Sequence, residues 1–144
     1  MPRRARRSPL VEEWFAKARE DLQAAAILAG REKLAGIAAF HLQQAAEKGL
    51  KGYLIHHGWT LVRTHDVEAL LNEAATHDRR LSRFLKGAIT LSGVYISERY
   101  PSPAIGARLS QARVPRLLAM TVDLVGRLST ACGLHLRLPA KRKE

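Results

Sequence analysis

The chain has 144 residues, enough for one domain to bury a hydrophobic core without disulfide bonds or metal ions. Its single cysteine, Cys132, excludes an internal disulfide and is expected to be a small buried residue in a reducing compartment. No apolar run reaches the roughly 18 residues of a membrane span, and the basic start is followed by charged residues, not by an apolar signal core. We therefore expect a protein of the cytoplasm that is neither exported nor membrane-bound.

The net charge of +11 is concentrated at the two ends of the chain. Residues 1–9 contribute +4 and residues 133–144 contribute +3, which leaves +4 (11 − 4 − 3) for the body. Short basic ends are usually solvated and disordered, and a minority bind phosphates or anionic surfaces. We predict a helical domain at residues 11–132, flanked by a disordered basic tail at 1–10 and a basic tail at 133–144.

Apolar residues repeat at helical spacing along most of the chain, and we identify no stretch that alternates with a period of two. The pattern predicts a first helix from about Val11 to Ala29, ended by Gly30. A second helix is expected from about Leu34 to His56, ended by Gly58. No internal repeat or long linker divides the chain, so a single domain follows.

Three further helices are expected after the second. Thr64 or Asp66 can cap a short third helix. A fourth runs from about Arg80 to Ser97, because prolines 101 and 103 stop it. The last helix can be capped by Ser110 and ends near Cys132, with Pro115 requiring a later start or a kink. Short connections favour antiparallel neighbours, so the predicted fold is an all-α bundle of five helices.

The second helix carries a polar stripe. At about 100° per residue, five polar side chains fall within a sector of roughly 120°: His41, Gln44, Glu47, Lys48 and Lys51. A solvated face with Gln44–Lys48 and Glu47–Lys51 partners would explain them. Phe40 projects into the same sector, where an aromatic ring is unfavourable unless a partner chain or a ligand covers it. Gly49 and Gly52, which cost about 1 kcal/mol each inside a helix, indicate close packing there.

Two other stretches offer side chains to an anion. Asp66 is explained as a helix cap, whereas His65 is either exposed, or donates to a carboxylate such as Glu47 or to a ligand phosphate. Arg99 can pair with Glu98 or Glu47, or bind a phosphate with its planar guanidinium group.

Other chemistries find little support. His56 and His57 are adjacent, point about 100° apart on a helix and lack further ligands at metal-binding spacing. Neither a glycine-rich phosphate loop nor a GxSxG nucleophile motif occurs. Cys132 and His135 are near each other in sequence only, which is weak evidence for a nucleophile. We predict no metal site and no cofactor.

Three stretches together resemble the signature of HEPN domains: FHLQQAAEKGLKGYL at 40–54, THDVEALL at 64–71 and YISERYP at 95–101. The resemblance covers about residues 11–132. It implies a five-helix up-and-down bundle, usually a homodimer, often encoded beside a small nucleotidyltransferase in a toxin and antitoxin-like module. Some HEPN members are metal-independent RNases marked by an Arg followed after four to six residues by His, and others are regarded as nucleotide- or substrate-binding partners.

The chain departs from the nuclease mark. No Arg has a His at the required distance: Arg99 is followed there by residues 104–106, and Arg127 reaches His135 only after seven intervening residues. Without that His, the expected acid or base of the reaction is missing. The resemblance therefore does not predict cleavage by the usual HEPN route.

Our leading hypothesis is a non-catalytic protein that binds a nucleotide or nucleic-acid phosphate and pairs with a nucleotidyltransferase. Its predicted site residues are Phe40, His41, Gln44, Lys48, Lys51, His65, Arg99 and Tyr100. The three cations would bind phosphate, Phe40 or Tyr100 would stack on a base, and the remaining side chains would donate hydrogen bonds. The alternatives are an RNase with an altered active site, in which His41 or His65 acts beside Arg99, and a purely structural dimer or interaction module.

Overall fold

The structure, a computed structural model, describes residues 8–99 and 111–139, and of residues 95–99 and 111 only the backbone. The described parts contain five α-helices and three short 3-10 turns, and no strand. The helices are α1 (Pro9–Leu28), α2 (Ala35–His56), α3 (Val67–Ala75), α4 (Leu85–Arg99) and α5 (Val114–Ala131), and the turns are η1 (Glu32–Leu34), η2 (Arg79–Phe84) and η3 (Gln111–Arg113). The prediction of an all-α fold is confirmed. Ser110, most of the N-terminal tail and the end of the C-terminal tail lie outside the described residues.

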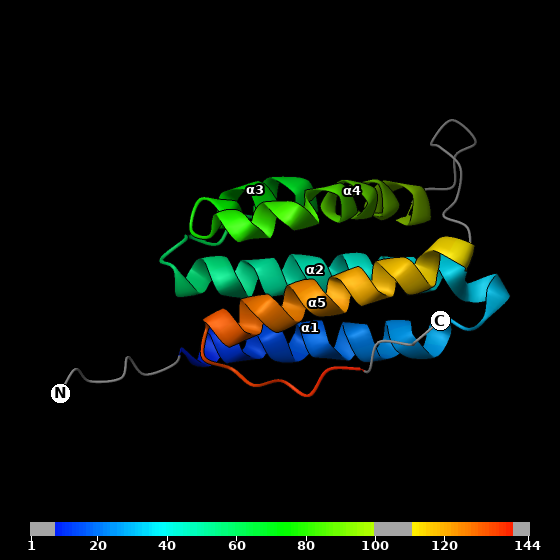
Figure 1. The fold of residues 1–144 in the computed structure, drawn as a ribbon, viewed down its shortest axis with the longest axis horizontal. Helices are drawn as coiled ribbons and strands as arrows, with labels where there is room; N and C mark the ends of the chain where they lie inside the picture. Colours follow the sequence, from blue (N-terminus) through cyan, green and yellow to red (C-terminus); the bar gives the residue numbers. More distant parts are fainter. Residues whose placement is uncertain (1–7, 100–110, 140–144) are drawn as a thin grey trace.

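Helix α2 is the centre of the bundle. It contacts each of the other four α-helices, with α1 and α5 on one side and α3 and α4 on the other (Figure 1). Helices α1, α2, α4 and α5 alternate in direction, as an up-and-down bundle requires (Figure 1). None of the described helices is long and apolar enough to cross a membrane.

The helix ends follow the predicted signals in two places and depart from them in a third. Asp66 caps α3 by accepting a hydrogen bond from the backbone N–H of Ala69 at 3.1 Å. Pro115 falls in the first turn of α5, so the later start is the alternative that the structure adopts. The predicted fourth helix instead begins as the 3-10 turn η2, because the Asp78 carboxylate accepts from the backbone N–H of Arg80 and tightens the chain there.

Both glycines of α2 lie at close helix contacts, as the sequence predicted. A Cβ atom on Gly49 would lie 3.3 Å from Val125 Cγ2 in α5. A Cβ atom on Gly52 would lie 3.0 Å from the Phe15 ring in α1. The missing side chains therefore let two neighbouring helices approach the backbone of α2.

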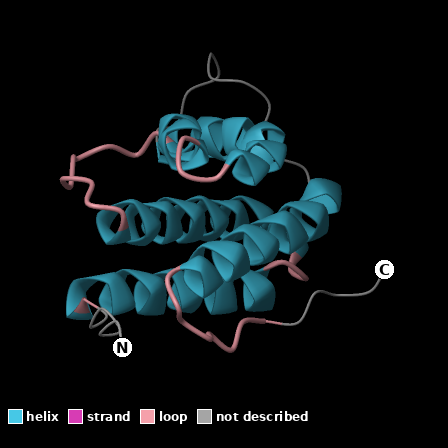
Figure 2. Ribbon diagram, turned by 60° about the vertical axis from the view of Figure 1, so that its left-hand side comes forward, coloured by secondary structure: helices cyan, strands magenta, loops and turns pink. Residues whose placement is uncertain are grey.

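The chain after α5 differs from the predicted basic tail. Gly133 turns the chain with a φ of 76°, and the extended residues that follow run back along the bundle (Figure 2). Leu134 is buried in the core, and Leu136 and Leu138 pack against it. The sequence Leu134–Leu138 alternates apolar and polar residues, so the statement that no stretch has a period of two was wrong. Residues 133–139 are part of the folded domain.

Candidate functional site

The polar stripe of α2 is organised by two carboxylates, and the first is Glu47. Glu47 is only 4% exposed, and its carboxylate has three side-chain partners. Lys51 Nζ lies 3.2 Å from Oε2, and His65 Nδ1 lies 2.8 Å from Oε1. Gln43 Nε2 lies 3.3 Å from Oε1 and also donates to the backbone carbonyl of His65 at 3.2 Å. We call these four residues the Glu47 cluster.

The second carboxylate comes from α1 and faces the same helix. Asp21 Oδ1 lies 2.9 Å from His41 Nδ1, and Asp21 Oδ2 lies 2.6 Å from Lys48 Nζ. We call these three residues the Asp21 cluster. Gln44 belongs to neither cluster, and its Nε2 donates a hydrogen bond to Gln43 Oε1 at 2.7 Å.

Helical spacing explains how one helix serves two clusters. Gln43, Glu47 and Lys51 are four residues apart, so they form a row toward the loop that carries His65. His41 and Lys48 are seven residues apart, two turns along the same side, and they meet Asp21 of α1. The predicted stripe is therefore divided between a loop and a neighbouring helix.

Most of the predicted site residues come together, with different partners from those expected. The Glu47–Lys51 pair forms, whereas Lys48 pairs with Asp21 and not with Gln44. Lys51 is only 5% exposed and its Nζ lies 5.7 Å from the centre of the Trp14 ring, so it is not on a solvated face.

The aromatic members and Arg99 are less fully placed. The half-buried ring of Phe40 lies 6.1 Å, centre to centre, from that of His41. Arg99 is the last residue of α4, but its side chain and all of Tyr100 lie outside the described residues.

Two residues of these clusters, Asp21 and Gln43, were not predicted from the sequence. Asp21 stands on the inner face of α1 beside Ala18, Leu22 and Ala25. Gln43 stands next to Leu42 on the buried side of α2, and it is completely buried. A polar residue in an apolar row was the available signal, because such a residue requires a partner inside the fold.

The arrangement fixes two histidines at the surface of the protein. The His41 and His65 side chains are 31% and 50% exposed, and each holds Nδ1 against a carboxylate. A carboxylate that accepts from Nδ1–H orients the ring and favours the tautomer in which Nε2 is the acceptor. Since each carboxylate also has a lysine partner, the negative charge of each cluster is balanced without its histidine.

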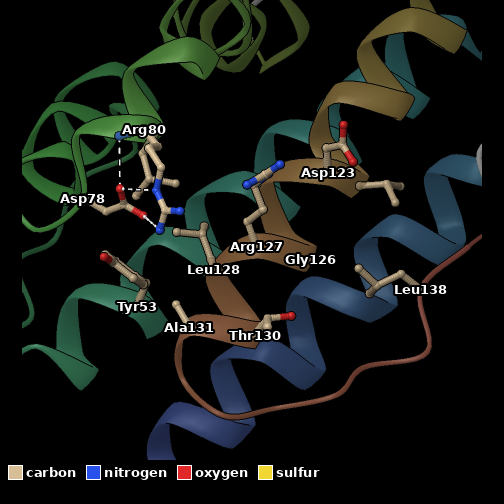
Figure 3. A pocket seen from close by; sticks show the side chains of 12 residues that line it. Tyr53, Asp78, Arg80, Asp123, Gly126, Arg127, Leu128, Thr130, Ala131 and Leu138 are labelled. Atoms are coloured by element: carbon tan, nitrogen blue, oxygen red, sulfur yellow. Dashed lines mark hydrogen bonds and ion pairs between the residues drawn. The ribbon is translucent and has the colours of Figure 1, made fainter.

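A pocket of about 580 Å³ lies elsewhere, between the end of α2, η2 and α5 (Figure 3). Arg80 Nε and Nη2 donate to the two oxygens of Asp78 at 3.0 and 3.2 Å, and these hydrogen bonds lower the pKa of Asp78. Burial, and then the charge of Asp78, raise the pKa of Tyr53. With Asp123 and Arg127 also in its lining, the pocket has two acidic and two basic side chains. None of the predicted site residues whose side chains the structure describes lines it.

Histidines gather at the end of α2 without forming a metal site. The His57 and His77 rings stack 4.4 Å apart, and Tyr53 lies 4.5 Å from His57. Partial burial lowers the pKa of His57, and His77 and His56 lower it further. Among the described residues, no three His, Cys, Asp or Glu side chains could hold one metal ion. Burial raises the pKa of Cys132 to about 12, which leaves it a protonated thiol at neutral pH.

Comparisons with known proteins agree with this architecture. The family model described as HEPN domain matches residues 11–121. The crystal structure of an archaeal HEPN homologue superposes with a TM-score of 0.66, covering 87% of this chain and 99% of that chain. The two sequences are 22% identical, so this likeness concerns the fold. A search of curated proteins gave no match.

Proposed function

The chain belongs to the HEPN domain family, and on that premise we propose that it binds the phosphate of a nucleotide or of RNA at the polar face of α2. We further propose that it does so as the partner of a small nucleotidyltransferase in a toxin and antitoxin-like module. The resemblance in three stretches of the sequence, which implies such partners, supports this second part.

The observation that carries the phosphate site is the pair of surface histidines held by carboxylates that already have lysine partners. Because Lys48 and Lys51 neutralise the two carboxylates, this face carries no unbalanced negative charge that would repel a phosphate. A bound phosphate would accept charge-assisted hydrogen bonds from His41 and His65 in their imidazolium form. The buried Glu47 cluster holds one ring in place before the ligand arrives.

The other predicted residues have supporting roles in this proposal. Gln44 would donate a hydrogen bond, and Phe40 or Tyr100 would stack on a base. Arg99 would add a further cation from the end of α4. Lys48 and Lys51 would act mainly by balancing Asp21 and Glu47.

Calorimetry with ATP and with a short single-stranded RNA tests the site. We expect His41→Ala and His65→Ala each to weaken binding about tenfold, because a charge-assisted hydrogen bond contributes about 1.5 to 3 kcal/mol. His135→Ala, at an exposed position in the segment after α5, is the matched control and should bind as the wild type does. A wild-type protein that binds neither probe contradicts the proposal.

A second candidate, the RNase with an altered active site, is favoured by the same histidines. A carboxylate that orients a histidine is the arrangement that general acid or base catalysis uses. We nevertheless expect no cleavage of single-stranded RNA or tRNA, because no Arg has a His at the HEPN nuclease distance. Metal-free cleavage that disappears in His41→Ala or His65→Ala would establish the enzyme instead.

The proposed nucleotidyltransferase partner is tested by examining the neighbouring gene and by co-purification. If the adjacent reading frame encodes a small nucleotidyltransferase, the two proteins should co-purify as a complex when expressed together. Two chains that elute separately at equal concentration would contradict the partnership while leaving the phosphate site untouched.

A further inference from the structure

A second surface, distant in sequence from the α2 clusters, concentrates positive charge in a groove. It has a volume of about 530 Å³ and lies where η2 and α4 face η3 and the first turns of α5. Four of its nine lining residues are basic: Arg83, Lys86, Arg113 and Arg116. We call this site the α4–α5 groove.

The charge of the α4–α5 groove is not balanced by nearby acids. None of its nine lining residues is acidic, and none of the four cations forms an ion pair with a residue that the structure describes. The sequence agrees, since residues 79–97 and 111–122 contain no Asp or Glu. Four like charges around one groove repel one another, so their clustering favours an anion between them.

The two sides of the groove are built in the same way. Residues 83, 86 and 90 on one side and 113, 116 and 120 on the other have the spacing of one helix face. The Arg83 guanidinium lies 4.6 Å from the centre of the Phe84 ring, which helps to hold it in place. Gly87 also lines the groove, and Met120 packs against its backbone. A Cβ atom added to Gly87 would lie 2.4 Å from Met120 Cε. The cations therefore face each other across a hollow and are not scattered over a flat surface.

The chemistry of the lining indicates what kind of anion fits. The nine lining residues include no aromatic ring on which a base could stack, and no carboxylate or side-chain amide that could pair with cytosine or adenine. Arginine and lysine, by contrast, are the usual partners of backbone phosphates. A groove lined on both sides by such cations suits a chain of phosphates passing through it.

We propose that the α4–α5 groove binds the phosphodiester backbone of a single-stranded nucleic acid, with little preference for base sequence. This site is separate from the α2 clusters and does not depend on the function proposed for them. The two sites differ in their chemistry: the α2 face presents two histidines held by carboxylates, whereas the groove has permanent charge from arginine and lysine.

Fluorescence anisotropy with labelled oligonucleotides of about eight residues tests the groove. The test variant carries Arg83→Gln, Lys86→Gln, Arg113→Gln and Arg116→Gln. The matched control carries Lys17→Gln, Arg31→Gln, Lys33→Gln and Arg137→Gln, four exposed cations that do not line the groove. Both variants have a formal net charge of +7 (11 − 4) and keep the same chain ends. All eight positions are exposed, so both variants should remain folded, and circular dichroism checks this.

We expect the groove variant to bind oligouridylate RNA about tenfold more weakly than the control does, or weaker still, at roughly 50 mM KCl. The slope of log affinity against log salt should become shallower by about 2.8, because each phosphate contact on a single strand contributes about 0.7. Oligothymidylate DNA should show the same loss if only the backbone is bound, and a loss confined to RNA would assign the site to RNA.

Equal losses in the two variants would overturn the proposal, because net charge alone would then explain the binding. Binding that survives in the groove variant but is lost in His41→Ala and His65→Ala would place the nucleic acid on the α2 face instead. Vesicles of phosphatidylserine provide a third probe. A groove variant that loses vesicle binding but binds both oligonucleotides as the control does would replace the nucleic acid with an anionic membrane surface.

Discussion

Glu47 is a charged side chain that is almost wholly buried, and its neighbours explain why the fold tolerates it. Its partners Lys51, His65 and Gln43 come from α2 itself and from the loop before α3. Removing one member of such a buried pair leaves the other as an unpaired charge in a poorly hydrated place. The residue therefore contributes to stability as well as to the proposed site.

We predict that Glu47→Ala lowers the free energy of unfolding by about 3–5 kcal/mol, because Lys51 would stay buried without its partner. Urea denaturation measures the loss. Glu20→Ala is the control, since Glu20 and Lys17 form an exposed pair at 3.7 Å and such pairs contribute about 0–1 kcal/mol. Equal losses in the two variants would show that the Glu47 cluster is solvated in solution.

The histidines at the end of α2 predict a dependence of stability on pH. Because the pKa of His57 is lowered in the folded protein, the unfolded chain binds a proton that the folded chain refuses. The stability that depends on neutral His57 is then fully present above pH 6.5, the ordinary pKa of histidine. It is lost as the pH falls through the lower pKa of His57 in the folded protein. The lowered pKa of Asp78 has its effect below 3.8, outside this range.

We therefore expect the urea midpoint to fall between pH 7.5 and pH 5, and His57→Gln to make that fall smaller. His135→Gln, at an exposed position in the C-terminal segment, should leave the fall unchanged. A His57→Gln protein with the wild-type pH profile would exclude His57 as the group responsible.

At the scale of single residues, the sequence predicted which side chains share a stripe better than it predicted their partners. Helical spacing placed His41, Lys48 and Lys51 on one stripe, because spacing is a local property. It did not show that Asp21 of α1 would meet Lys48, since that contact joins residues 27 positions apart. The orientation of α1 against α2, which decides the pairing, is set by packing of the whole core.

The close approach of α1 to α2 depends on a single glycine. A Cβ atom on Gly52 would lie 3.0 Å from Phe15 Cε2 and 3.1 Å from Trp14 Cβ. Both distances are shorter than ordinary carbon contacts, so an added methyl group forces the aromatic side chains to move. Gly93 in α4 offers a contrast, because no described atom lies within 4 Å of the place that its Cβ atom would take.

We predict opposite signs for the same substitution at these two helical glycines. Gly52→Ala should destabilise the protein by about 1–3 kcal/mol through overpacking. Gly93→Ala should stabilise it by up to about 1 kcal/mol, because alanine is the better helix former and has room. Thermal denaturation of both variants measures the difference, and two stabilised proteins would mean that α1 adjusts freely to the added methyl group.

The elements show where sequence patterns were sufficient and where they were not. The bounds of α1 and α2 lie within two residues of the predicted ones, because glycines and apolar spacing mark them, and α3 begins after Asp66, one of its two predicted caps. The basic charge of the segment after α5 predicts a tail, whereas its five-residue alternation of leucine with polar residues agrees with its packing against the core. A pattern so short becomes meaningful only once a neighbouring surface is available to cover its apolar side.

In the whole molecule, the positive charge is distributed differently in space than the sum over sequence segments indicates. The counts place +7 of the +11 in the two ends, yet residues 133–139 are folded against the core. In the body, the charges are sorted: carboxylates balance the lysines on α2, while the α4–α5 groove keeps four cations without an acidic partner among the described residues. A body charge of only +4 therefore contains a strongly positive region, which a sum over the sequence cannot reveal.

The surface of α2 predicts that the molecule assembles as a homodimer. HEPN domains often dimerise, and α2 leaves a large apolar side chain at the surface, since Ile37 is 48% exposed. The ring of Phe40 is half-buried beside the polar residues of α2, where a second copy of the chain would cover it. We predict a homodimer in which the two α2 faces lie near each other, so that each contributes to the other's site.

Light scattering at micromolar concentration should give twice the 16.0 kDa mass of the chain. Phe40→Arg should shift the mass to that of a single chain, because it places a charge inside the interface. Ile27→Arg, on α1, is the control and should leave the dimer intact, which would locate the interface on α2 and not merely on exposed apolar surface. A wild-type mass of 16.0 kDa would contradict the dimer, and dissociation by Ile27→Arg alone would move the interface to α1. In that case Phe40 would be left for a ligand, which strengthens the stacking role given to it in the phosphate site.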